Sequence, residues 1–121
     1  MSYQIIFYID REGKSLTEEF LDSLEVKVRA KVEKWIEKLE QYGPNLPRPY
    51  ADKVKGKIRE LRIIFQSTYY RFLFFFIGKT IVITHGFIKR TRKIPKTEIE
   101  RAERLRKDFL QRFKKGGEIK S

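Results

Sequence analysis

Three apolar stretches that follow one another with almost no intervening chain constrain the fold of this 121-residue sequence most strongly. They cover Ile58–Gln66, Tyr69–Ile77 and Thr80–Phe87, and only two residues separate each from the next. Connections this short join antiparallel strands, because parallel strands need a crossover of about a dozen residues or more. We therefore predict an antiparallel meander at the centre of the fold.

The rest of the chain supplies one more strand and the helices. Tyr3–Ile9 alternates with apolar residues on both faces and predicts a strand. Residues 15–24 and 28–42 carry apolar residues at helical spacing, and a last helix is predicted to begin at Pro95. We expect an α+β fold in the order β-α-α-β-β-β-α. It contains a mostly antiparallel four-stranded sheet, an N-terminal helical hairpin or kinked helix, and a C-terminal helix, with the helices in one layer on the sheet.

Size and composition limit the class of protein. The length predicts a single domain over residues 1–121, with a frayed polar tail at 114–121. The absence of cysteine excludes disulfides and thiolate metal sites and fits a cytoplasmic location. The apolar run Phe72–Ile77 is too short to cross a bilayer, so no membrane partner is expected. With one histidine and no glycine-rich phosphate loop, we expect neither a metal nor a cofactor.

The formal charge of +12 is unevenly distributed. Residues 1–50 contain 8 Lys and Arg against 9 Asp and Glu, whereas residues 51–121 contain 20 against 7. A basic segment of this kind indicates an anionic partner, although cations that only keep a surface soluble would give the same count.

The junction from Ile81 to Pro95 concentrates the groups suited to a polyanion. An apolar strand ends at His85-Gly86-Phe87 and passes into five cations within eight residues, namely Lys89, Arg90, Arg92, Lys93 and Lys96. A lone imidazole, an aromatic ring and a cation cluster at the end of a strand are suited to binding a polyanion and to acting on it.

Several short motifs resemble the RelE/HigB superfamily of toxins, and more closely its phage-derived HigB-type branch. They are Glu60-Leu61-Arg62, Tyr70-Arg71 and His85-Gly86-Phe87-Ile88-Lys89, with Pro95 and Glu98 to Glu100 downstream. The resemblance implies a small basic toxin encoded next to a cognate antitoxin, often a helix-turn-helix protein. Most such toxins enter the ribosome and cleave mRNA there. Others in the wider superfamily resemble ParE, which inhibits DNA gyrase.

Cleavage of RNA without a metal requires the 2′-OH to attack the adjacent phosphate while charge on that phosphate is neutralised. Arg62 and Arg71 lie on neighbouring predicted strands and are candidates for binding the phosphate. In the resemblance, Lys89 and Lys93 would contact the phosphate or donate a proton. His85 is a candidate acid or base, yet its alternation with Ile81, Ile83 and Phe87 favours a histidine that faces the core.

Further residues are candidates for RNA binding. Phe87 could stack on a base, although an aromatic residue at this place in a strand is more often part of the core, and Arg90, Thr91 and Arg92 could contact the RNA backbone. Lys53, Lys55 and Lys57 alternate, so in an extended chain they would point the same way and follow a phosphate backbone, whereas a solvated loop is the other interpretation. Two other functions stay open: a non-enzymatic ParE-like inhibitor of gyrase and an RNA-binding accessory domain.

Overall fold

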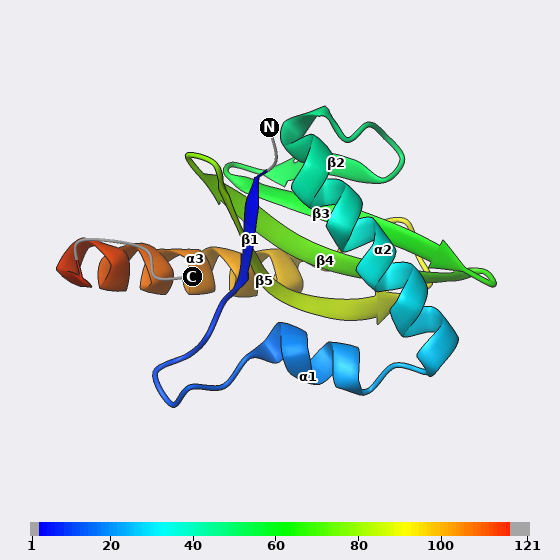
Figure 1. The fold of residues 1–121 in the computed structure, drawn as a ribbon, viewed down its shortest axis with the longest axis horizontal. Coiled ribbons are helices and arrows are strands. Elements are labelled where there is room, and N and C mark those ends of the chain that lie inside the picture. The colour runs from blue at the N-terminus through cyan, green and yellow to red at the C-terminus, as the bar shows by residue number, and fades with distance from the viewer. Residues whose placement is uncertain (1–2, 117–121) are drawn as a thin grey trace.

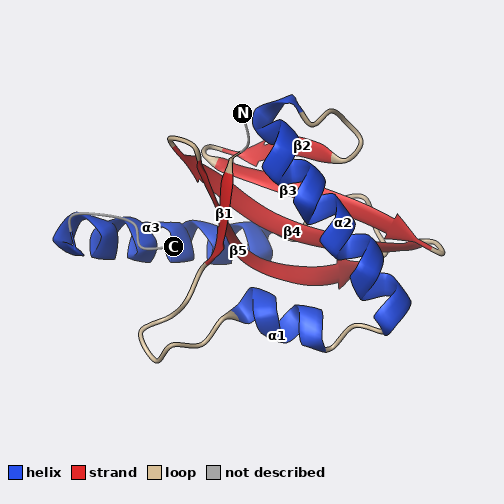
Figure 2. Cartoon of the chain, viewed as in Figure 1, coloured by secondary structure: helices blue, strands red, loops and turns tan. Residues whose placement is uncertain are grey.

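The computed structural model describes residues 3–116, which form five strands and three α-helices (Figures 1 and 2). In chain order these are β1 (Gln4–Phe7), α1 (Leu16–Asp22), α2 (Val26–Tyr42), a 3₁₀ turn (Gly43–Asn45), β2 (Ala51–Lys55), β3 (Ile58–Phe65), β4 (Thr68–Ile77), β5 (Thr80–Lys89) and α3 (Lys96–Gly116). The predicted α+β class and order are confirmed. The segment from 15 to 42 forms two separate helices. Of the predicted tail, residues 114–116 continue α3, and residues 117–121 lie outside the described residues.

The strands form one sheet in the order β1-β5-β4-β3-β2. β2 to β5 pair antiparallel as the predicted meander requires, while β1 pairs parallel to β5. The sheet therefore has five strands, and the prediction of four missed β2. That strand, Ala-Asp-Lys-Val-Lys, contains little apolar sequence because it lies at an edge and is held by its ladder with β3.

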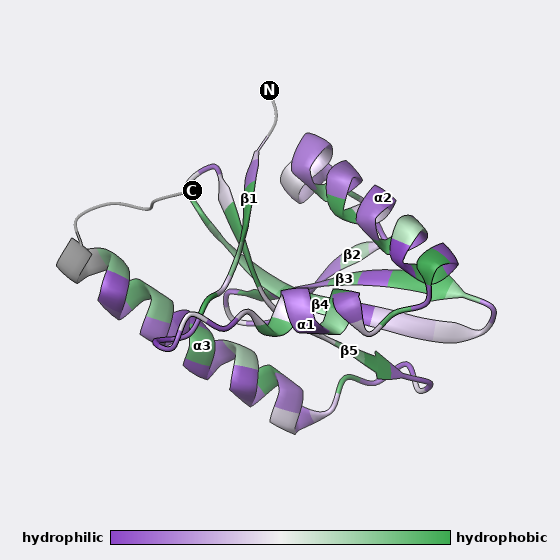
Figure 3. Cartoon of the chain, turned by 60° about the horizontal axis from the view of Figure 1, so that its bottom comes forward, coloured by the Kyte–Doolittle hydropathy of each residue, from purple (hydrophilic) through white to green (hydrophobic). Residues whose placement is uncertain are grey.

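The helices cover both faces of the sheet, so the predicted single layer of helices is wrong (Figure 3). α1 and α2 pack on the face that carries Phe72 and Ile83, and α3 packs on the face that carries Phe75 and Val82. The physical reason lies in β4, where the residues from Phe72 to Phe75 are all buried. Since neighbouring side chains of a strand point to opposite faces, a continuous apolar run needs cover on both.

A bulge interrupts the pairing of β4 with β5. Leu73 pairs with His85, whereas the next residue, Phe74, pairs with Ile83, so Thr84 is an extra residue in β5. The Thr84 hydroxyl donates a hydrogen bond of 3.0 Å to the Leu73 carbonyl at this irregularity. The extra residue is thus satisfied within the sheet.

The bulge reverses the alternation of side chains along β5. Ile81 and Ile83 face α1 and α2, while Phe87 packs with residues beneath α3, and His85 contacts α3 itself. The prediction that these four side chains share one side of the strand is therefore wrong. One inserted residue moves every later side chain to the opposite face.

The C-terminal half of α3 is tied to the end of β1 by a polar cluster. The Tyr8 hydroxyl donates to Asp108 Oδ2 at 2.6 Å, and Arg11 and Arg112 form ion pairs with the same carboxylate at 3.0 and 2.8 Å. Arg112 also donates to the Ile9 carbonyl at 2.6 Å. Burial and the neighbouring carboxylate raise the pKa of Tyr8 to about 12, so its hydroxyl remains a donor at neutral pH.

Replacing Tyr8 with phenylalanine should lower the free energy of unfolding by about 1–2 kcal/mol, because a hydrogen bond to a charged group is lost while the ring stays in place. Urea denaturation of the variant measures this loss. Tyr42→Phe, at a half-exposed tyrosine of α2, is the matched control. Equal losses in both variants would contradict the role given to Tyr8.

Candidate nucleic-acid interface

Two arginines predicted to converge lie directly opposite each other on neighbouring strands. Arg62 of β3 pairs with Arg71 of β4, which in turn pairs with Phe87 of β5. Partners in a ladder share a face, and Phe87 faces the α3 side of the sheet. The two guanidinium groups therefore lie on one face, as the sequence predicted.

A buried carboxylate lies between the two arginines. Glu60 is 3% exposed, and its Oε1 accepts from Arg62 Nη2 at 3.0 Å. Its Oε2 lies 3.4 Å from both Arg62 Nε and Arg71 Nε. A buried carboxylate needs such partners, because desolvation otherwise disfavours its charge. Glu60 thus accepts hydrogen bonds from Arg62 and faces Arg71 as an ion pair only, since Arg71 Nε has no hydrogen-bond partner among the described residues.

Arg71 connects this cluster to the chain that follows β5. Its side chain is fully buried, and it donates through Nη1 to the Arg92 carbonyl at 2.9 Å and through Nη2 to the Thr91 carbonyl. Burial lowers the pKa of the Arg71 guanidinium, and the charge of Glu60 opposes that effect. Direct contact between Arg71 and a phosphate does not fit this burial. In the structure Arg71 holds a loop.

That loop, which we call the basic loop, comprises Lys89 to Lys93. Its five side chains are all exposed, and four of them are cationic. Thr91 Oγ1 donates to the Lys93 carbonyl at 3.3 Å. Arg62, with 24% of its side chain exposed, is the cation of the neighbouring cluster that solvent reaches. The accessible part of the interface is therefore Arg62 together with the basic loop.

One aromatic residue lies beside this cluster. Tyr69 pairs with Lys89 across β4 and β5, and its partly exposed ring lies 5.3 Å from the Arg71 guanidinium carbon. Phe87, the predicted stacking residue, is 8% exposed and packs with Leu73 and Ala102. Phe87 is therefore inaccessible to a base, whereas Tyr69 lies at the surface.

His85 lies in the core on the α3 side of the sheet. It is 1% exposed, its Nε2 lies 3.1 Å from Glu98 Oε1, and its Nδ1 lies 3.1 Å from Thr84 Oγ1. Burial lowers the pKa of His85, Glu98 opposes this effect, and the nearby Arg101 and Arg104 add to it. A role in contact with substrate does not fit this position. The histidine instead joins β5 to the first turn of α3.

The three alternating lysines do not form one row. A register shift in β2 between Lys53 and Lys55 breaks the alternation. Lys53 and Lys57 line one hollow beside Phe76, whereas Lys55 and Lys57 line another against α3. The predicted continuous track for a phosphate backbone is therefore divided between two hollows.

Glu60, Thr84 and Glu98 organise the interface, although none is among the predicted site residues. Glu60 had two signals in the sequence, namely its place in the Glu60-Leu61-Arg62 motif and its position among apolar residues two before Arg62. Nothing in the sequence marked Thr84 as a bulge or Glu98 as the partner of His85. Within residues 3–116, no group of three or more His, Cys, Asp or Glu side chains could hold a metal ion. No helix in that range is long and apolar enough to cross a membrane.

Comparisons with known proteins place this geometry in a wider context. A sequence model of the family described as phage-derived protein Gp49-like matches residues 19–107. No curated protein sequence shows a significant match.

The structure is similar to solved structures of two complexes. One is the toxin–antitoxin complex RelBE2 of Mycobacterium tuberculosis, with a TM-score of 0.54 and 16% identity, covering 74% of this chain and 100% of the matched one. The other is the RelE–RelB complex of Pyrococcus horikoshii OT3, with a TM-score of 0.51 and 18% identity, covering 77% and 100%. At these identities the likeness concerns the fold.

His85→Gln should cost about 1–3 kcal/mol of unfolding free energy, because a buried hydrogen-bonded group is replaced. It should also remove a pH dependence. The lowered folded-state pKa means that the unfolded chain binds the proton more readily, so His85 makes stability fall as pH drops below about 6.5. Denaturant titrations at pH 7.5 and 5.0 measure this component.

Because His85 is the sole histidine, no other imidazole contributes to that difference. Glu98→Gln serves as the companion variant. It removes the group that opposes the shift, so the loss of stability at low pH should increase. An unchanged pH dependence in His85→Gln would contradict the assignment.

Arg71→Lys should loosen the basic loop, because the shorter ammonium group cannot donate to both loop carbonyls while facing Glu60. Losing two hydrogen bonds should raise the rate of tryptic cleavage within residues 89–93 on the order of tenfold. Mass spectrometry of timed digests measures this rate. Arg59→Lys, on the opposite face over Phe76, is the control and should leave the rate unchanged.

Proposed function

Because the chain belongs to the phage-derived Gp49-like family, we propose that it is the toxin of a toxin–antitoxin system and acts as a metal-independent, ribosome-dependent endoribonuclease. One observation carries the proposal. The exposed part of Arg62 lies one strand away from Arg71, whose guanidinium binds the backbone of the basic loop. A cationic site of this kind suits a phosphodiester, because arginine binds phosphate oxygens through a planar fork and keeps its charge.

In this proposal the accessible cations act on the scissile phosphate. The 2′-OH gives its proton to water as it attacks phosphorus, the bond from phosphorus to the 5′-oxygen breaks, and the products are a 2′,3′-cyclic phosphate and a 5′-OH. Arg62 stabilises the charge that develops on the phosphate oxygens. Lys89 and Lys93 add positive charge, and one of them protonates the departing 5′-oxygen.

The remaining residues position these groups or the RNA. Arg71 and His85 act without touching the substrate, Arg71 through the carbonyls of the basic loop and His85 through Glu98. Tyr69 takes the stacking role first considered for Phe87, because its ring is partly exposed on the same face. Arg90, Thr91 and Arg92 contact the RNA backbone, and we expect a cytoplasmic protein that meets mRNA on the ribosome.

A cognate antitoxin is the expected protein partner. One similar structure is a toxin–antitoxin complex and another is a RelE–RelB complex, which supports this expectation. The resemblance to HigB-type toxins favours a helix-turn-helix protein encoded next to this chain.

The burial of His85 and Arg71 favours a second candidate, a non-enzymatic inhibitor of DNA gyrase. With those groups enclosed, the accessible interface contains cations and a tyrosine but no imidazole. A basic surface without an acid–base pair can bind an acidic protein or DNA. Pulse labelling separates the two functions, because a nuclease stops translation and cuts messages, whereas gyrase inhibition leaves messages intact and blocks supercoiling.

Arg62→Ala should lower the rate of mRNA cleavage by about 10²–10³-fold, the usual effect of removing one preorganised donor at a developing charge. Primer extension on mRNA in a translation extract detects the cut sites. Arg62→Lys, which keeps the charge but loses the fork, should fall between Ala and the unmodified protein.

Arg59→Ala on the opposite face is the control for this series. Thermal unfolding of each variant separates lost activity from lost structure. Cleavage at the unmodified rate by a folded Arg62→Ala protein would remove the mechanism proposed here.

A further inference from the structure

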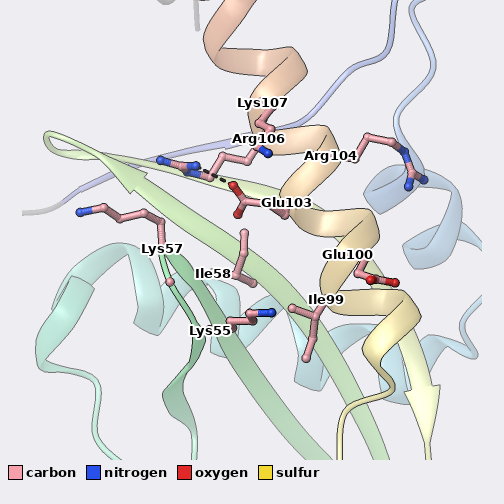
Figure 4. Close-up of a pocket in the computed structure, with 10 residues that line it drawn as sticks. Lys55, Lys57, Ile58, Ile99, Glu100, Glu103, Arg104, Arg106 and Lys107 are labelled. Atoms are coloured by element: carbon pink, nitrogen blue, oxygen red, sulfur yellow. Dashed lines mark hydrogen bonds and ion pairs between the residues drawn. The ribbon is translucent and has the colours of Figure 1, made fainter.

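A hollow between the β2–β3 turn and α3 lies apart from the accessible cations described above (Figure 4). We call it the α3 groove, and it has a volume of about 520 Å³. Ile58 of β3 and Ile99 of α3 form its apolar floor. Lys55, Lys57 and Lys107 lie at its rim, and all three are exposed.

The lining is amphipathic and carries a net positive charge. Ile58 is fully buried, so the apolar surface that a partner reaches comes from the partly exposed Ile99 and from the aliphatic parts of the lining lysine and arginine side chains. Arg106 is paired with Glu103 at 2.9 Å, and the lining also contains one further carboxylate, Glu100, and one further arginine, Arg104, so the net positive charge equals that of the three rim lysines. An apolar side chain flanked by carboxylates matches this arrangement.

A nucleic acid matches the groove less well. Single-stranded RNA is held by aromatic rings that stack on its bases together with cations along its backbone. The residues that line the groove include no aromatic side chain. Phosphates could approach the lysines, but two isoleucines give a base nothing to stack on.

The dimensions of the groove suit a helix. Its α3 wall runs from Ile99 to Lys107, a distance of about 12 Å at 1.5 Å per residue. A partner helix of about two turns would follow this wall with apolar residues at helical spacing toward the isoleucines. Its acidic residues would then face the lysines.

We infer that the α3 groove is the docking site for an acidic amphipathic helix of the antitoxin, an inference that rests on the proposed function. The groove is separate from the candidate catalytic groups. Ile58 at the floor and Arg62 are four positions apart on β3, which places them about 13 Å apart. The antitoxin helix therefore binds this chain without filling the space between Arg62 and the basic loop.

Two substitutions in the full-length protein test the inference. Lys107→Glu reverses a charge at the rim, and Ile99→Asp places a carboxylate on the floor. The probe is the purified product of the open reading frame adjacent to this gene, titrated by calorimetry. Each variant should weaken binding about tenfold or more, because like charges face each other or the apolar contact is lost.

The control is Lys34→Glu, which makes the same charge change at an exposed lysine of α2 on the other face of the sheet. It should change the affinity less than twofold. Lys107 is exposed, so its variant keeps the test valid even where Ile99→Asp fails to fold, as circular dichroism would reveal. Both groove variants should still cleave mRNA, since neither residue belongs to the candidate catalytic groups.

The outcomes are distinguishable. One outcome is that the neighbouring gene product binds Lys107→Glu, Lys34→Glu and the unmodified protein with equal affinity. That result would contradict docking at the α3 groove and leave the proposed function standing. No binding by the unmodified protein would overturn both. Reduced affinity for an RNA oligonucleotide with unchanged protein binding would make the groove an RNA site and also overturn the inference.

Discussion

The carboxylate of Glu60 is the group on which the geometry of the interface depends. It is nearly inaccessible and lies between two guanidinium groups that face each other across β3 and β4. Without it, Arg62 and Arg71 would repel at the distance of a cross-strand pair. With it, the cluster keeps one net positive charge, and that charge is exposed at Arg62. Removing one partner of a buried ion pair is strongly destabilising, whereas the complete cluster is tolerated.

Arg71 transmits this order to the basic loop through the backbone. Its donors bind the carbonyls of Thr91 and Arg92 and no side chain of that loop. The four cationic side chains of Lys89–Lys93 therefore stay in water, free to meet an anion. A loop with this charge density repels itself, so an attachment through carbonyls is needed to keep it compact without neutralising it.

The sequence predicted the sheet well where local rules apply and failed where a long-range contact decides. Two-residue connections specified the antiparallel strands, and Gly43 ended α2 where predicted. The bulge at Thr84 follows from pairing with β4, and no local signal marks it. Because of this bulge, His85 faces the α3 side of the sheet, opposite to Ile83. β2 was missed because an edge strand needs little apolar sequence.

The same difference between local rules and long-range contacts applies to the site residues. The sequence located the cations of the interface and the face shared by Arg62 and Arg71, because charge and alternation are local properties. It could not show that α3 and the basic loop enclose Arg71, His85 and Phe87. The burial of these three residues depends on where the following chain and α3, which are distant from β4 in the sequence, pack on the sheet. Reactive residue types were thus recognised, while their access to a substrate was not.

The basic loop is fixed at two points and the chain that follows it at a third, and this explains how so exposed a segment can be preorganised. Its first residue, Lys89, is held in the ladder with Tyr69, and its middle is bound by Arg71. Beyond its end, Glu98 in the first turn of α3 is bound to His85. Stabilisation of a developing charge is effective when the donors are already in place, because no reorganisation is then required. A loop attached only at its ends would have to order itself around each phosphate, whereas one held at its middle by a buried guanidinium does not.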